Sequence, residues 1–170
     1  AASFEGSCTS RNILLELILS GKELMAQADM EQIQQVLYNL LDNAVKFSSD
    51  NSSITLETTV NHGKVFVSVK DHGTGIPKES LSRIWDRFYK IDMHHTGSGI
   101  GLALVKAFVE MHGGMISVES DEKQGTVFTV ELPVQSCEAV AAEPDTTLVS
   151  ADSRTTDVLL AEEEELEKRP

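Results

Sequence analysis

The chain has 170 residues, a formal net charge of −13 and only two cysteines, Cys8 and Cys137. That length is enough for one domain with its own hydrophobic core. An acidic chain without a basic stripe argues against nucleic acid as the main partner. No apolar run approaches the roughly 20 residues of a membrane-spanning helix, so we expect no membrane contact from this chain. Two distant cysteines make no disulfide framework, which favours a reducing, cytoplasmic compartment.

Charge and composition divide the chain into three predicted parts. Residues 1–10 have no periodicity and are expected to form a loose lead-in. Residues 11–134 carry 16 acidic and 11 basic side chains and contain the regular hydrophobic patterns. Residues 135–170 carry 10 acidic and 3 basic side chains, and we predict a disordered acidic tail there. Because the chain starts at Ala1 without a signal peptide, we expect a piece of a longer protein, whose membrane topology it does not reveal.

The first half of the predicted domain contains the strongest helix pattern. Arg11–Leu19 favours a largely buried strand, although periodicity alone leaves a short helix open. Glu23–Ala28 is expected to form a short second strand after a turn. Asp29 has the chemistry of a helix N-cap, with Gln32 completing a capping box. Apolar residues then recur every three or four positions, at Ile33, Val36, Leu37, Leu40, Leu41, Ala44 and Val45.

The second half alternates hairpins with helices. The predicted elements are strands Ile54–Val60 and Lys64–Asp71, a helix from Pro77 towards Tyr89, a helix over Ile100–His112, and strands Met115–Ser120 and Thr126–Leu132. The total of about three helices and six strands predicts an α+β fold. We expect a two-layer sandwich, with the helices packed on a mixed, mostly antiparallel sheet.

Three polar residues share one face of the predicted central helix. Asn39, Asn43 and Lys46 follow the spacing i, i+4, i+7, beside the apolar stripe. Amide oxygens are hard ligands that suit Mg²⁺, and a lysine ammonium suits phosphate. The alternative is a solvated helix face in which Asp42 and Lys46 form an ordinary i, i+4 ion pair.

A carboxylate followed by glycines ends a valine-rich strand. Asp71-His72-Gly73-Thr74-Gly75-Ile76 places an acceptor for a base's amino group beside residues that allow a flat ring close to the backbone. The alternative is a turn with an aspartate cap, because this spacing alone is only moderately specific.

A second glycine-rich stretch, Gly97-Ser98-Gly99-Ile100-Gly101-Leu102, leads directly into a predicted helix. Free N–H groups and the positive end of the helix dipole would make an anion site there. The alternative is a flexible loop. The chain has no Walker lysine pattern and no protein-kinase motif set.

The order of these stretches resembles the catalytic ATP-binding domain of sensor histidine kinases, in the superfamily shared with gyrase, heat-shock chaperone and mismatch-repair ATPases. Q-V-L-Y-N-L-L-D-N-A-V-K-F resembles its N box, D-H-G-T-G-I its first glycine box and G-S-G-I-G-L-A-L-V-K its second. R-I-W-D-R-F-Y-K resembles the F box, and G-T-V-F-T-V-E-L-P resembles the closing motif. The resemblance spans residues 11–134. The F box and the closing motif favour the histidine kinase branch.

The resemblance implies binding of ATP and Mg²⁺ beneath an ATP lid. Asn43 would ligate Mg²⁺ with support from Asn39, Lys46 would contact phosphate, and Arg87 would approach the γ-phosphate. Asp71 would accept a hydrogen bond from the adenine amino group, and Phe88 would anchor the lid. The residues implied around the nucleotide are Asn39, Asn43, Lys46, Phe47, Asp71, Gly73, Gly75, Ile76, Arg87, Phe88, Gly97, Ser98, Gly99, Ile100, Gly101, Leu102 and Thr126.

The chain also departs from the family pattern. Phe47 stands where the family often has Tyr, and the lid, Lys90–Thr96, is short. None of the five histidines has the sequence context of the family's phosphoacceptor. The resemblance therefore implies a separate dimerisation domain that carries this histidine, and a response regulator as the next partner. We do not expect this chain to phosphorylate itself on histidine. His112 lies at a predicted helix end, where the dipole favours its cation.

Two other functions remain open at this stage. An anti-sigma-type serine/threonine kinase would use the same fold to phosphorylate a partner protein. A nucleotide-gated interaction module would bind ATP without transferring phosphate.

Overall fold

The computed structural model describes residues 4–20, 28–91 and 97–133. The elements are α1 (Glu5–Ser10), β1 (Leu14–Ile18), α2 (Met30–Phe47), β2 (Ser53–Asn61), β3 (Lys64–Lys70), a short 3-10 helix (Lys78–Ser80), α3 (Gly101–Met111), β4 (Met115–Asp121) and β5 (Gly125–Pro133). These elements lie in the compact unit Ala1–Cys137. None of the described helices is long and apolar enough to cross a membrane.

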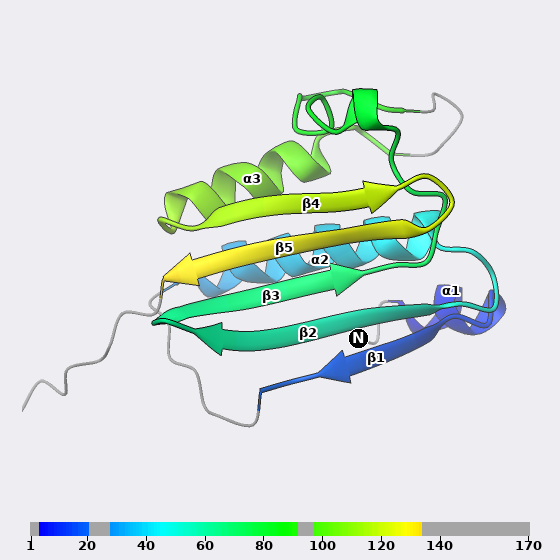
Figure 1. Cartoon of the computed structure of the whole chain (residues 1–170), viewed down its shortest axis with the longest axis horizontal. Coiled ribbons are helices and arrows are strands. Elements are labelled where there is room, and N and C mark those ends of the chain that lie inside the picture. The colour runs from blue at the N-terminus through cyan, green and yellow to red at the C-terminus, as the bar shows by residue number, and fades with distance from the viewer. Residues whose placement is uncertain (1–3, 21–27, 92–96, 134–170) are drawn as a thin grey trace, which may run out of the picture. The chain divides into compact units, whose positions relative to one another are not determined.

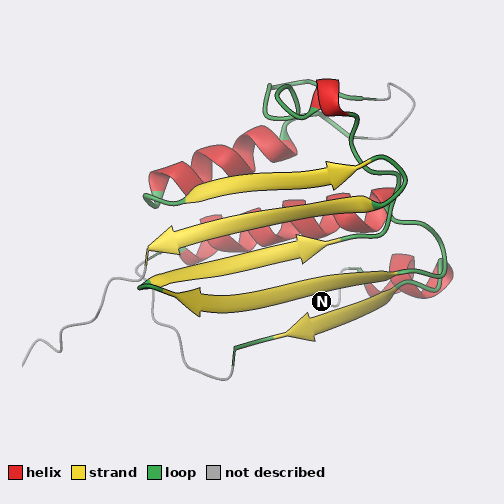
Figure 2. Ribbon diagram, in the orientation of Figure 1, coloured by secondary structure: helices red, strands yellow, loops and turns green. Residues whose placement is uncertain are grey.

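The predicted two-layer α+β sandwich is confirmed. The sheet has the order β1-β2-β3-β5-β4, and the helices described lie on one of its faces (Figures 1 and 2). β1 runs parallel to β2, and the other neighbouring strands pair antiparallel. The strands predicted over Arg11–Leu19 and in the two hairpins are present, with slightly different ends.

Helix α2 forms where the periodic apolar stripe predicted it. The Asp29 side chain accepts hydrogen bonds from the backbone N–H groups of Glu31 and Gln32, which caps the helix start. Val36, Leu40, Ala44 and Val45 are buried on the face that packs on the sheet. They meet alternating residues of the strands in one core that also includes Ile54, Val69, Val105, Val109, Phe128, Val130 and Leu132.

The prediction of a loose lead-in over residues 1–10 is wrong for the described residues 4–10. Instead of a loose lead-in, Glu5–Ser10 form helix α1, and Phe4 and Cys8 are buried in the core. The Phe4 ring lies 5.1 Å from the Tyr38 ring of α2, centroid to centroid. The two buried side chains lie four positions apart, and two such residues are too few to give a periodic pattern in the sequence.

The segment after Pro77 corrects a second prediction. Where one helix was expected, the structure has the short helix Lys78–Ser80 and then a series of turns, in which Ile84 N–H bonds to Ser80 O and Asp86 N–H to Arg83 O. The backbone of Phe88 is left-handed, with φ of +67°, and ends any helical continuation.

Three predictions fall wholly or mainly outside the described residues. They are the second strand over Glu23–Ala28, the lid over Lys90–Thr96 and the acidic tail over 135–170. The structure describes only Ala28 of the predicted strand and only Lys90 and Ile91 of the predicted lid. None of these three residues belongs to a strand.

Candidate functional site

Asp71 follows the last residue of β3 and is almost fully buried. Its Oδ1 accepts hydrogen bonds from the N–H groups of Gly73 (3.0 Å) and Thr126 (3.2 Å). Burial raises the pKa of this carboxyl above its ordinary value, and the two backbone N–H groups partly offset that effect. Within the described residues, Oδ2 has no hydrogen bond. The fold therefore holds a buried carboxylate by one oxygen and leaves the other as an acceptor.

Glycines around Asp71 allow three backbone segments to touch. A Cβ on Gly73 would lie 2.1 Å from Phe47 O, and one on Gly125 would lie 2.1 Å from Asp71 O. Gly75 has φ of +69°, and its Cβ would lie 2.1 Å from Asp121 O. The sequence predicted room for a flat ring at Gly73 and Gly75. The structure shows a different requirement, because neighbouring backbone already occupies the side of each α-carbon that a Cβ would need.

Ile76 and Thr126 are joined to this end of the sheet by one hydroxyl. Ser120 Oγ accepts from Ile76 N–H at 2.8 Å and lies 2.9 Å from Thr126 Oγ1. Thr126 itself is buried. The structure thus brings the predicted site residues Asp71, Ile76 and Thr126 together where β3, β4 and β5 meet. Ser120 was not predicted, because nothing in its local sequence distinguishes it from other strand serines.

The second group of site residues lies on α2. The Lys46 ammonium is 2.5 Å from the Asp42 carboxylate, so the ion pair named as the alternative is present. Asn43 is half-buried. Asn39 Oδ1 accepts a hydrogen bond of 3.3 Å from Gln35 Nε2, while Asn39 Nδ2 is buried without a partner in the described part of the chain.

The start of α3 lies against this face of α2. A Cβ on Gly101 would lie 3.6 Å from Asn39 Oδ1, so the second glycine-rich stretch reaches Asn39. No side chain caps α3, and its N-cap residue is Ile100. Gly99 has φ of +70°. The first N–H groups of α3 therefore form an uncapped, electropositive helix end beside Asn39, whose Nδ2 has no partner in the described residues.

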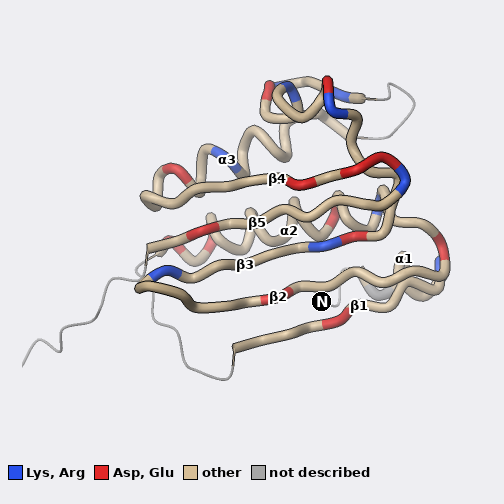
Figure 3. Tube along the Cα trace, in the orientation of Figure 1, with Lys and Arg blue, Asp and Glu red and all other residues tan. Residues whose placement is uncertain are grey.

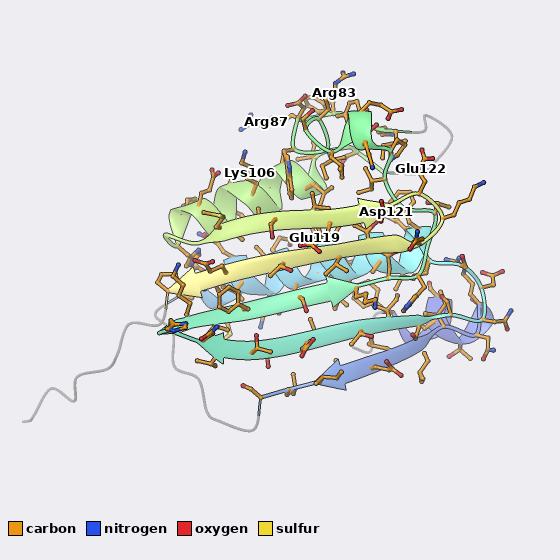
Figure 4. All side chains as sticks on the ribbon, in the orientation of Figure 1. Arg83, Arg87, Lys106, Glu119, Asp121 and Glu122 are labelled. Carbon is orange, nitrogen blue, oxygen red and sulfur yellow. The ribbon has the colours of Figure 1, made fainter. Side chains whose placement is uncertain are left out.

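Two residues of the F box, Arg87 and Phe88, are exposed to solvent. Phe88 is 71% exposed, and its backbone N–H bonds to Gly99 O at 2.8 Å. Arg87 is exposed, and Figure 4 shows it above α3, on the same side as Lys106. The guanidinium of Arg83 lies 4.4 Å from the Tyr89 ring centroid. The structure does not bring Arg87 into contact with the polar face of α2.

Charged side chains lie on both sides of these groups, and the segment before the lid and the β4–β5 turn each carry both signs (Figure 3). The basic residues Arg83, Arg87 and Lys106 belong to the segment before the lid and to α3, whereas Glu119, Asp121 and Glu122 lie on β4 and the turn after it (Figures 3 and 4). No group of three or more His, Cys, Asp or Glu that could hold a metal is found among the residues described.

His112 has hydrogen-bond partners on two helices. The Asp29 N–H donates to His112 Nε2 at 2.9 Å, and Nδ1 lies 2.7 Å from Phe108 O. His112 therefore joins the end of α3 to the start of α2, a contact between residues 83 positions apart that the sequence pattern did not reveal.

Arg11 is a further residue whose role was not predicted. Its guanidinium donates to Val45 O and Ser48 O at the end of α2 and pairs with the Asp50 carboxylate at 2.7 Å. It thereby satisfies carbonyl groups left open by the helix end, next to Phe47, whose carbonyl oxygen lies close to Gly73.

Comparison with known proteins places this arrangement in a family. Residues 28–136 match the family described as histidine kinase-, DNA gyrase B- and HSP90-like ATPase. The sensor histidine kinase WalK of Bacillus subtilis (strain 168) is 40% identical over 121 residues, which cover 68% of this chain and 20% of WalK. The sensor protein SrrB of Staphylococcus aureus (strain NCTC 8325 / PS 47) is 40% identical over 109 residues, covering 62% of this chain and 19% of SrrB. The chain thus spans about a fifth of the length of these relatives.

Solved structures agree with the sequence comparison. The catalytic domain of histidine kinase ThkA, in a nucleotide-free form, superposes with a TM-score of 0.70 at 33% identity, covering 78% of this chain and 86% of that one. Full-length ShkA in complex with AMPPNP gives a TM-score of 0.70 at 28% identity, with 78% and 28% covered. The sheet order, the motif positions and these similarities together show that the chain belongs to the histidine kinase-, DNA gyrase B- and HSP90-like ATPase family, with a domain of the sensor histidine kinase catalytic type.

Proposed function

We propose that this domain binds ATP with Mg²⁺ and delivers the γ-phosphoryl group to a histidine on a separate dimerisation domain. A response regulator would then receive the phosphoryl group, and ThkA has been solved in complex with such a protein, TrrA, at 30% identity to this chain. The observation that carries the proposal is Asp71, a buried carboxylate with one oxygen fixed by two N–H groups and the other without a hydrogen bond in the described residues.

Asp71 suits recognition of adenine because its free oxygen can accept from an exocyclic amino group. A buried carboxylate forms a stronger hydrogen bond than an exposed one, since water does not compete for it. Its raised pKa is consistent with a site kept dry. Replacing the amino group of adenine by a carbonyl would set two acceptors against each other, so this oxygen discriminates between purines.

The polar face of α2 and the start of α3 suit the phosphates. Three groups here can bind phosphate oxygens: the uncapped N–H groups of α3, the Asn39 Nδ2 donor and the Lys46 ammonium. Mg²⁺ would be held by the amide oxygen of Asn43 and by phosphate oxygens, and would offset their charge. Arg87 lies outside this group in the structure, so a role at the γ-phosphate requires it to move.

The relatives favour the histidine kinase reading over the serine/threonine alternative, because both curated relatives described above are sensor proteins. The residues that stabilise a transferring phosphoryl group would act by positioning and charge, as phosphoryl transfer requires. We place Asn43, Lys46 and Arg87 in these roles.

Calorimetric titration of ATP into this chain, with and without Mg²⁺, tests the proposal. We expect micromolar-range binding that strengthens with Mg²⁺, and at least about a tenfold loss in Asp71→Asn, the loss expected for one charge-assisted hydrogen bond. Glu119→Gln, which neutralises an exposed carboxylate on β4, is the matched control and should bind like the parent chain. Absence of ATP binding by the unmodified chain contradicts the proposal.

The phosphoryl acceptor is tested separately. The chain is incubated with labelled ATP and a dimerisation domain from a sensor histidine kinase. Acid-labile labelling of that domain supports transfer to histidine, because phosphohistidine is lost in acid. Acid-stable labelling favours the serine/threonine kinase, and ATP binding without any labelling favours the nucleotide-gated module.

A further inference from the structure

Gln35 and Asn39 form a hydrogen-bonded pair on the face of α2 that meets α3. Gln35 lies one helical turn before Asn39, and its Nε2 donates to Asn39 Oδ1 at 3.3 Å. The Asn39 side chain in turn lies against Gly101, at the first turn of α3. Gln35 is exposed, whereas Asn39 is half-buried. The pair therefore runs from solvent to the uncapped start of α3.

The hydrogen bond decides which end of the Asn39 amide is available. An asparagine amide offers an oxygen acceptor and a nitrogen donor, and rotation by half a turn about χ2 exchanges them. Gln35 occupies the oxygen, and Nδ2 is left buried and without a partner among the described residues. A buried donor without a partner destabilises the domain, so this orientation is one that a ligand's acceptor would stabilise.

We infer that Gln35 is a positioning residue that orients the Asn39 amide so that its nitrogen donates to a phosphate oxygen of the nucleotide. This inference rests on the proposed function and narrows it. Asn39, expected from the family resemblance to support the metal, instead contacts phosphate, and the metal is left to Asn43. The adjacent start of α3 also presents only N–H donors, so both groups select an anion rather than a cation.

A double-mutant cycle tests the inference. ATP binding in the presence of Mg²⁺ is measured by calorimetry for the unmodified chain, Gln35→Leu, Asn39→Ala and the double variant. We expect Asn39→Ala to weaken binding about tenfold and Gln35→Leu about threefold or more, as for loss and misorientation of one hydrogen bond to a charged group. Because Gln35 acts through Asn39, adding Gln35→Leu to Asn39→Ala should cause no further loss.

Gln34→Leu is the matched control. Gln34 is the exposed neighbour of Gln35 on the same helix, and no hydrogen bond of its side chain is found within the described residues. The same replacement there should leave ATP affinity unchanged. Equal binding by Gln35→Leu and Gln34→Leu overturns the inference, as does a double variant whose loss is the product of the two single losses. Failure of the unmodified chain to bind ATP would instead remove the proposed function.

Asn39→Asp separates the phosphate role from a metal role. The new carboxylate keeps the oxygen but lacks the N–H donor and adds negative charge beside the phosphates. We expect weak binding that added Mg²⁺ does not restore. Binding that becomes as tight as in the unmodified chain at high Mg²⁺ would identify residue 39 as a metal ligand and overturn the inference.

Discussion

The two ends of the proposed nucleotide site differ in how many of their polar groups are paired within the described residues. At the Asp71 end, Oδ1 has two N–H partners and the neighbouring glycines bring three backbone segments into contact. At the α2–α3 end, Asn39 Nδ2 has no partner in the described residues, no side chain caps α3, and Lys46 pairs with Asp42. The Asp71 end, where we propose that the base binds, is therefore preorganised. The α2–α3 end, where we propose that the phosphates bind, has donors that a negatively charged ligand would pair.

The largest expected effect comes from Gly73→Ala, which disturbs the backbone packing at the Asp71 end of the site. The added Cβ would lie 2.1 Å from Phe47 O, far inside van der Waals contact. Overpacking against backbone leaves little scope for adjustment, so we expect a loss of about 3 kcal/mol or more of unfolding free energy. Urea denaturation followed by circular dichroism measures it.

Gly6→Ala provides the control for that substitution. Gly6 lies in α1, and nothing is within 4 Å of the Cβ it would gain. Alanine in a helix should raise stability by up to about 1 kcal/mol relative to glycine. If Gly73→Ala were as stable as Gly6→Ala, the close contact with Phe47 could not be what fixes the Asp71 end.

Arg11→Met tests how the end of α2 is held beside that preorganised end. The replacement keeps much of the aliphatic stem and removes hydrogen bonds to Val45 O and Ser48 O as well as the Asp50 ion pair. We expect a loss of about 2 kcal/mol in unfolding free energy, mostly from the two carbonyl groups. Asp50→Asn removes only the exposed ion pair and should cost less than about 1 kcal/mol. Equal losses in the two variants would assign the effect to the ion pair.

Asp71→Asn should move stability and binding in opposite directions. The amide oxygen still accepts from Gly73 and Thr126, so the turn is retained, while the charge that burial penalises is removed. We expect about tenfold weaker ATP binding and a melting temperature on the order of 2 °C higher at neutral pH. Lower stability with unchanged ATP binding would assign Asp71 to the fold rather than to the nucleotide.

The pH dependence of that stability difference has a definite sign. Because the folded state raises the pKa of Asp71 above 3.8, it binds the proton more tightly than the unfolded chain does. Protonation of Asp71 stabilises the folded chain. This contribution is fully present below the ordinary pKa of 3.8 and is lost as the pH rises through the raised pKa of the folded state. The stabilisation by Asp71→Asn should therefore be smallest in acid and grow through this interval. Scanning calorimetry of the unmodified chain and of Asp71→Asn, at about ten pH values between roughly pH 3 and 8, measures this difference in stability.

The sequence predicts the parts of this molecule whose cause is local. The apolar repeat of α2 and the alternation in β3 identify elements and core faces, because each depends on neighbours within a few residues. The hydrogen bond between Gln35 and Asn39 could also have been predicted, because residues four positions apart lie on the same face of a helix. The contacts of Arg11 with α2 and of His112 with Asp29 join residues 34 to 83 positions apart, and no local pattern encodes them.

The site shows the same limit. The order of the motifs identified Asp71 and the glycine-rich stretches, but could not distinguish glycines needed for a ring from glycines needed for backbone contact. The F box was misread as helical because Ile84, Trp85 and Tyr89 all pack on or in the core, a spacing that a helix also gives. The left-handed backbone of Phe88 depends on its bond to Gly99, which the chain order does not reveal.

The smallest expected effect sharpens the comparison at the phosphate end. Asp42→Asn releases Lys46 from its ion pair and removes one negative charge from the face that meets the phosphates. An i, i+4 pair contributes about 0.3–0.5 kcal/mol, so stability should fall only slightly. ATP affinity should rise about two- to threefold at low salt, and the gain should shrink as added salt screens it. Glu31→Gln, which removes the same charge from the first turn of α2, should leave affinity nearly unchanged. Weaker ATP binding by Asp42→Asn would mean that the ion pair holds Lys46 where the phosphates need it, and the phosphate end would then be preorganised as well.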